Sequence, residues 1–139
     1  MKLPQSVTET SIDRGTILHS TDFEGIGHGK FFVIIGVSGN NVAGFFFINS
    51  NIHPVLFGKK EQLAMQYPMK KSDYDFLKYD SFLCATAVMT RDKTDMARLI
   101  NEGVMEIKGI MKQEHLEELL DSLRKSKLFS AIEKRDFFY

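Results

Sequence analysis

The sequence predicts an α+β fold in which a compact, mainly antiparallel β-barrel is followed by C-terminal helices. The β-rich runs come first and the clearest helical pattern comes last, without the regular strand–helix alternation of a parallel sheet. Closing about seven short strands into a barrel would also cover the edges of a Phe-rich hairpin. The 139 residues suffice for one domain, with a loose lead-in over 1–13, the barrel over 14–111 and the helices over 112–139.

A β-hairpin is the strongest local pattern in the chain. The β-rich runs 31–37 and 42–49 flank Ser38-Gly39-Asn40-Asn41, whose Gly and Asn residues favour a tight turn. Adjacent Phe residues in these runs point to opposite sides of a sheet. We therefore expect either that both faces of the sheet are covered or that one face meets a partner chain.

Other elements are predicted from spacing and from stop signals. Four leucines at helical spacing predict a helix over 113–127, and Gly103 is expected to end a short helix over 92–102. The tail is amphipathic, and its final Phe137-Phe138-Tyr139 is expected to dock either on the body or on another molecule. Short strands are expected at 15–20, 53–57, 81–88 and 104–110, whereas 61–78 fits neither pattern.

Charge and cysteine content exclude several classes of protein. The 18 Lys and Arg residues balance 18 Asp and Glu residues, which excludes a highly basic nucleic-acid arm but allows a local basic patch. The single cysteine, Cys84, excludes an internal disulfide framework and a Cys-x-x-Cys zinc site. With no signal-peptide run at the start and no apolar stretch of ~20 residues, we expect a cytoplasmic protein without a membrane partner.

A candidate site lies at the base of the hairpin. His28 and Lys30 precede its first strand and Ser50 follows its second, so the returning chain is expected to bring them close together. A lysine, a hydroxyl and an imidazole could bind a phosphodiester and move a proton. The alternative is that all three are solvated loop residues. A metal site from His19, His28 and His53 lacks ligand spacing, so no metal or cofactor is expected.

Short motifs across residues 14–128 carry a resemblance to a known family. They are Gly27-His28-Gly29-Lys30-Phe31 with its apolar continuation, Asn49-Ser50 at the end of the hairpin, the Tyr79–Cys84 run, and Glu106–Met111 before the Leu-rich helix. In content and order these motifs resemble the MazF/PemK/Kid toxins, which are small cytoplasmic endoribonucleases. The resemblance implies an SH3-like barrel, a homodimer, metal-free cleavage of single-stranded RNA, and inhibition by an antitoxin protein.

The resemblance also assigns roles to individual residues. Lys30 takes the place of the family's catalytic arginine and Ser50 that of its hydroxyl residue. His28, chosen from its place beside Lys30 and not from the resemblance, is the best candidate for proton transfer. Leu83 and Ala85 stand where one branch of the family has an Arg and an Asp beside a cysteine. RNA contacts are expected from a basic cluster of Lys59, Lys60, Lys70 and Lys71.

Two other interpretations stay open. A non-catalytic module of the same fold, of the CcdB type or antitoxin-binding, would act by protein–protein contact through its Phe-rich sheet or its terminal aromatic residues. The apolar Leu83 and Ala85 favour this alternative, as does Lys30, because lysine cannot form the bidentate phosphate contact of arginine. The remaining interpretation is a small β-rich domain unrelated to the toxins.

Overall fold

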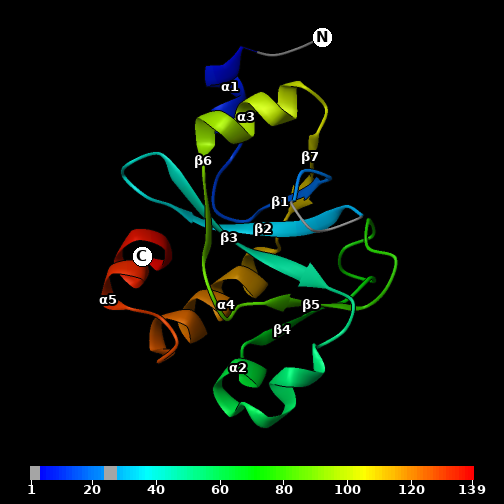
Figure 1. The fold of residues 1–139 in the computed structure, drawn as a ribbon, viewed down its shortest axis with the longest axis vertical. Coiled ribbons are helices and arrows are strands. Elements are labelled where there is room, and N and C mark those ends of the chain that lie inside the picture. Colours follow the sequence, from blue (N-terminus) through cyan, green and yellow to red (C-terminus); the bar gives the residue numbers. More distant parts are fainter. Residues whose placement is uncertain (1–3, 24–27) are drawn as a thin grey trace.

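Seven strands pair in one antiparallel sheet in the computed structural model, which describes residues 4–23 and 28–139. The strand order is β4-β5-β3-β2-β1-β7, and β6 pairs with β3 beyond the end of β5 (Figure 1). The predicted α+β class and antiparallel pairing are confirmed. The sheet is not closed, since no pairing joins β4 to β7 within the described ranges. The strands are β1 (Thr16–Ser20), β2 (Lys30–Val37), β3 (Val42–Asn49), β4 (Gln66–Met69), β5 (Ser81–Cys84), β6 (Met89–Asp92) and β7 (Met105–Ile110).

The predicted hairpin forms the centre of this sheet. β2 and β3 pair in register from Phe31 opposite Ile48 to Val37 opposite Ala43, with one irregularity near Gly36. Asn41 closes the turn at a φ of 63°, a left-handed conformation that asparagine tolerates better than most residues. The hairpin therefore returns the chain to the level of Lys30.

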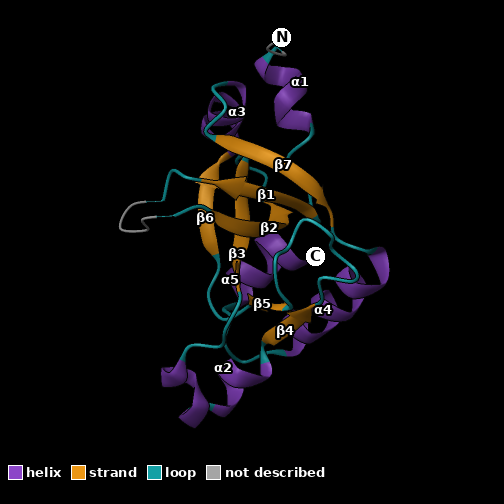
Figure 2. Ribbon diagram, turned by 90° about the vertical axis from the view of Figure 1, so that its right-hand side faces the viewer, coloured by secondary structure: helices purple, strands orange, loops and turns teal. Residues whose placement is uncertain are grey.

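Both faces of the sheet are covered by the protein's own chain. On one face Phe46 and Leu83 pack with the helix α4 (Gln113–Lys125) and with Phe138. On the other face Phe32 and Phe45 pack with the helix α3 (Lys93–Asn101). Figures 1 and 2 show α1 (Gln5–Thr10) and α3 on one side of the central strands and α4 and α5 (Ala131–Glu133) on the other. The Phe-rich strands are thus internal, and this settles the choice in favour of two covered faces.

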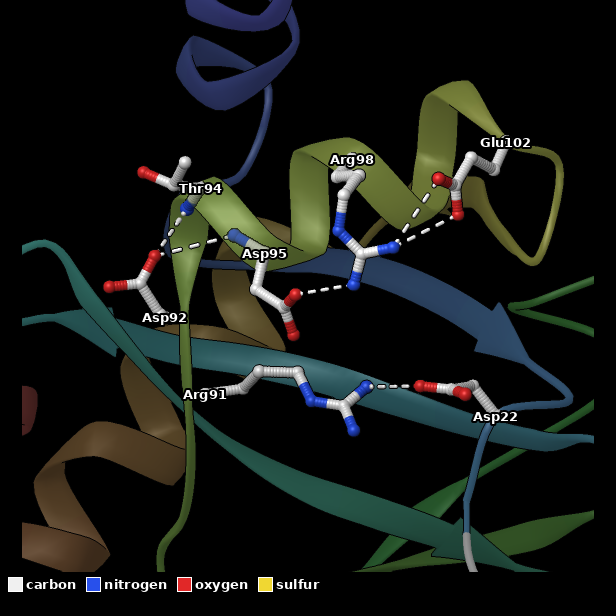
Figure 3. Close-up of polar contacts among 7 residues, drawn as sticks. All are labelled: Asp22, Arg91, Asp92, Thr94, Asp95, Arg98 and Glu102. Atoms are coloured by element: carbon white, nitrogen blue, oxygen red, sulfur yellow. Dashed lines mark hydrogen bonds and ion pairs between the residues drawn. The ribbon is translucent and has the colours of Figure 1, made fainter.

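The predicted helices over 92–102 and 113–127 are confirmed as α3 and α4. The carboxylate of Asp92 accepts hydrogen bonds from the backbone N–H groups of Thr94 and Asp95 and so caps α3 (Figure 3). Gly103, at a φ of 79°, lies just beyond the C-terminal end of α3. The four leucines of α4 are buried: Leu116, Leu119, Leu120 and Leu123.

The C-terminal tail docks on the body of the protein. It forms α5 (Ala131–Glu133) and one turn of π-helix, η2 (Lys134–Phe138), and it buries both Phe137 and Phe138. Arg124 donates to the carbonyl of Phe138, and Arg14 donates to those of Phe137 and Tyr139. Arg14 therefore fixes the tail.

Three local predictions are wrong. The expected strand at 53–57 is the 3₁₀-helix η1 (Pro54–Gly58), because Pro54 lacks an N–H and His53 Nδ1 accepts from the N–H of Val55. The expected loose lead-in contains the helix α1 (Gln5–Thr10), in which the Thr8 hydroxyl donates to Asn101. The strand expected over 81–88 ends at Cys84, and β6 follows it. The undecided segment contains α2 (Lys60–Ala64) and β4.

Across the described ranges, no helix has the length and apolar character needed to cross a membrane.

Candidate functional site

A cavity of about 380 Å³ opens where β2 begins and β3 ends. One part of its wall is polar, and another part is apolar and aromatic. The polar side chains come from β1, from the start of β2 and the loop before it, from the end of β3 and the residue after it, and from the start of β5 and the segment before it. The residues used below are His19, His28, Gly29, Lys30, Phe31, Asn49, Ser50, Phe76, Lys78 and Tyr79.

Lys30 is held at the mouth of the hairpin by two neighbours on β3. Its Nζ donates a hydrogen bond to Oδ1 of Asn49 and lies 5.5 Å from the centre of the Phe47 ring. Partial burial lowers the pKa of Lys30 below 10.5, and the nearby Cys84 opposes this shift. The ammonium group is therefore partly desolvated, which strengthens its attraction for an anion.

Ser50 and His28 line the same cavity as Lys30. Ser50 follows the last residue of β3 and is exposed, as is His28, two positions before β2. A second hollow of about 340 Å³ shares Lys30, Asn49 and Ser50 and extends to His53 and Pro54. The predicted trio thus lies around one cavity, and two of its members also border the adjoining hollow.

His19 is a cavity residue that sequence analysis considered only as a metal ligand. It lies on β1 opposite Phe31 of β2, and the centres of the two rings are 4.7 Å apart. Partial burial lowers the pKa of His19 below 6.5, and Lys108 adds to the shift while Glu106 opposes it. His19 could have been found from the sequence by pairing the two adjacent predicted strands, because an antiparallel pairing places residues 19 and 31 side by side.

Aromatic side chains form part of the cavity wall. The Phe31 and Phe76 rings lie 5.4 Å apart, and Tyr79, which lines the same cavity, is 66% exposed. Lys78 lines the cavity between Phe76 and Tyr79 in sequence. None of these four residues was predicted as a site residue. Phe31 and Tyr79 were noted only as parts of strand motifs, and the segment 61–78, which contains Phe76 and Lys78, has no clear period.

The predicted basic cluster does not reach the cavity. Lys59 and Lys60 lie at the start of α2, and Lys70 and Lys71 follow β4. All four are exposed, and the linings of the two hollows do not include them. Lys71 Nζ instead donates to the carbonyl of Leu77 at 2.9 Å. A role for these lysines in RNA binding stays a prediction.

The positions flanking Cys84 are closed to charged groups. Leu83 and Ala85 have no exposed surface and belong to the core that packs against α4. Cys84 itself is half-buried and accepts a 3.5 Å hydrogen bond from Gln66 Nε2. In the part of the chain that the structure describes, no three His, Cys, Asp or Glu side chains cluster as metal ligands.

The arrangement suits the binding of a phosphodiester. An ammonium group and a hydroxyl can contact phosphate oxygens, two imidazoles can transfer protons, and an aromatic wall can stack on a base. No protein-family model matches this chain, and a search of curated proteins gives no match.

Proposed function

We propose that this protein binds single-stranded RNA in the cavity beside the hairpin and cleaves it as a toxin-like endoribonuclease of the MazF/PemK type. The observation that carries the proposal is the shared cavity of Lys30, Ser50 and His28, which aromatic side chains also line. The hairpin pattern selected these three residues, which lie up to 22 positions apart in the chain, and the sequence resemblance then gave roles to Lys30 and Ser50. Their common place in the lining of one cavity supports a joint role.

The expected chemistry follows from the side chains present. Lys30 stabilises the negative charge that builds on the phosphorus oxygens when a 2′-hydroxyl attacks the neighbouring phosphate. The Ser50 hydroxyl donates a hydrogen bond to a phosphate oxygen and orients it, and His28 transfers a proton. The exposed Tyr79 ring, which lines the same cavity as Phe76, offers a surface on which an unstacked base can lie.

Assembly and regulation are proposed from the resemblance alone. The protein acts as a homodimer in the cytoplasm, and an antitoxin protein holds it inactive. Size-exclusion chromatography with light scattering tests the dimer.

The cleavage proposal is tested with a mixed-sequence single-stranded RNA in the presence of a chelator. Wild type is expected to cut, and Lys30→Ala and Ser50→Ala are each expected to lower the rate on the order of a hundredfold or more. Lys127→Ala is the matched control, since this exposed lysine follows α4 and does not line the cavity. Intact RNA after incubation with folded wild-type protein would contradict the proposal.

A second function, protein binding without cleavage, is favoured by one surface. Val55 and Phe57 of η1 are 57% and 65% exposed, and η1 begins beside the second hollow. The Phe-rich sheet and Phe137-Phe138 are covered by the chain itself, so they are no longer the candidate surface for a partner. Leu83 and Ala85, which stand where one branch of the family has an Arg and an Asp, also favour binding without cleavage.

Growth arrest separates this function from the first. If expression arrests growth while the purified protein leaves RNA intact, binding is the cause. Val55→Ser combined with Phe57→Ser should then relieve the arrest, whereas Lys30→Ala should not. The opposite pattern, relief by Lys30→Ala alone, supports cleavage.

A further inference from the structure

His19 is the one imidazole in the cavity that a rigid strand positions. β1 pairs with β2 on one side and with β7 on the other, so the backbone at residue 19 is held by strands on both sides. His28, by contrast, lies in the segment before β2 and is exposed. A group that must meet a reacting atom at a fixed distance is better placed on a strand than on a loop.

The His19 ring is clamped by its neighbours. Phe31 packs against it in an edge arrangement, with 61° between the ring planes. On another side the Cε1 and Nε2 atoms lie so close to Gly29 that a side-chain Cβ at position 29 would clash with them. No hydrogen bond ties either ring nitrogen to another residue in the described ranges 4–23 and 28–139. The nitrogens therefore lack a structural partner there.

The charges around the cavity favour a neutral ring at position 19. Lys108 and Glu106 face it from β7 and form a 3.1 Å ion pair with each other. His28 faces it from the loop, and Lys30 and Lys78 line the same cavity. Burial and the positive neighbours lower the pKa of His19 below 6.5, so the ring is mostly neutral at pH 7 and can accept a proton.

We propose that His19 is a further catalytic residue, the general base that removes the proton from the attacking 2′-hydroxyl of RNA. This inference rests on the proposed function and names a residue that the sequence resemblance did not assign to catalysis. His28 then has the complementary role of proton donor to the leaving group. The two imidazoles, which line the same cavity, form an acid–base pair.

The proton balance of this step is complete without another reactant. An imidazole nitrogen of His19 takes the 2′-hydroxyl proton as the 2′-oxygen forms a bond to phosphorus. The bond from phosphorus to the 5′-oxygen breaks, its electron pair stays on that oxygen, and the imidazolium of His28 protonates it. The products are a 2′,3′-cyclic phosphate and a 5′-hydroxyl, and the two histidines return to their starting states by proton exchange with water.

Single-turnover cleavage of mixed-sequence RNA in chelator tests the proposal. His19→Ala is expected to cut on the order of a hundredfold more slowly than wild type. Its affinity for a fully 2′-O-methylated RNA, which cannot be cleaved, should change by no more than a few fold. His19→Gln is the second variant, which fills the site if the alanine variant is unstable. His115→Gln on α4 is the control, since His115 does not line the cavity.

Two readouts separate proton transfer from a structural role. Free imidazole should restore part of the cleavage by His19→Ala while leaving the control and the enzyme-free rate unchanged. The wild-type rate should rise with pH through a midpoint below 6.5, and this limb should vanish in both His19 variants. Cleavage by a folded His19 variant at the wild-type rate would overturn this inference alone. Failure of wild type to cut any RNA would overturn the proposed function and this inference with it.

Discussion

Lys30 combines a positive charge with partial burial, so the proposed binding of RNA should be sensitive to alkaline pH. Its pKa lies below 10.5 because burial disfavours the charged form. As pH rises through that pKa the ammonium group loses its proton, so the attraction for phosphate is lost. We expect wild type to release 2′-O-methylated RNA at a lower pH than Lys30→Arg, whose guanidinium stays charged.

Fluorescence polarisation of labelled 2′-O-methylated RNA between pH 7 and pH 10.5 measures this difference in binding. Other lysines titrate in both proteins, so comparison with the arginine variant isolates residue 30. Superimposable curves for wild type and Lys30→Arg would mean that Lys30 does not contact the phosphate.

Gly29 supplies a second prediction, because it leaves room for the His19 ring. An alanine at this position would push a methyl group into Cε1 and Nε2 of His19 and displace the ring or the chain before β2. Displacing a reacting group by ~1 Å typically costs on the order of a hundredfold in rate. We expect Gly29→Ala to lose cleavage to that extent in the same assay.

Gly39→Ala is the matched control for that substitution. Gly39 lies in the hairpin turn, and an added Cβ would meet nothing within 4 Å. It should therefore keep the wild-type rate. Equal rates for the two alanine variants would show that the position of the His19 ring does not matter.

The candidate site could be predicted from the sequence only where the hairpin dictates it. His28, Lys30 and Ser50 flank two strands with a clear pattern, so their shared location followed from chain reversal. Phe76 and Lys78 come from a segment without a period, and their approach to the cavity depends on tertiary packing. His19 was noted in the sequence, but its position beside Phe31 depends on the pairing of β1 with β2.

Strands and helices could be predicted from local sequence where apolar residues repeat at a regular spacing. The prediction failed where strand pairing or a side-chain cap determines the structure. The β2–β3 hairpin and α4 have strong periods and were predicted. β6 reads Met-Thr-Arg-Asp, three of its four residues are exposed, and it forms because β3 offers it a partner. The η1 segment has β-type residues, but Pro54 and the His53 side chain direct it into a helical turn.

The N-cap of α3 allows a prediction about stability. Asp92 Oδ1 accepts from the N–H of Thr94 at 2.8 Å and from that of Asp95 at 3.3 Å (Figure 3). Asp92→Ala removes both bonds and should lower the free energy of unfolding by about 1 kcal/mol. Asp92→Asn keeps an accepting oxygen and should be close to wild type. Urea denaturation measures both variants, and wild-type stability in Asp92→Ala would show that the cap contributes nothing.

In the molecule as a whole, the two faces of the sheet and its rim have different roles. Helices cover both faces of the sheet, so the large apolar side chains are used for stability. The cavity lies at the rim, where β2 begins and β3 ends, and its polar residues other than the buried Ser81 are half-buried or exposed. Substitutions there are therefore expected to change function with little effect on folding, which makes the proposed assays interpretable.

The charge of the whole molecule leads to the last prediction, which concerns salt. The protein has no formal net charge, so phosphates must be neutralised by local lysines. Lys30 and Lys78 line the cavity, whereas Lys59, Lys60, Lys70 and Lys71 do not. Single-stranded nucleic acid gives a slope of about −0.7 in log K against log salt for each phosphate neutralised. Two lysines thus predict a slope of about −1.4, and all six would give about −4.

Titrations of 2′-O-methylated RNA at several salt concentrations distinguish these cases. If the cavity alone binds the strand, replacing the four outer lysines by glutamine leaves the slope of about −1.4 unchanged, because their side chains contact no phosphate. Lys78→Gln should then reduce the slope by about 0.7. A steep wild-type slope that becomes much smaller in the fourfold variant would instead mean that the RNA also contacts α2 and the end of β4. The basic cluster predicted from the sequence would then bind RNA.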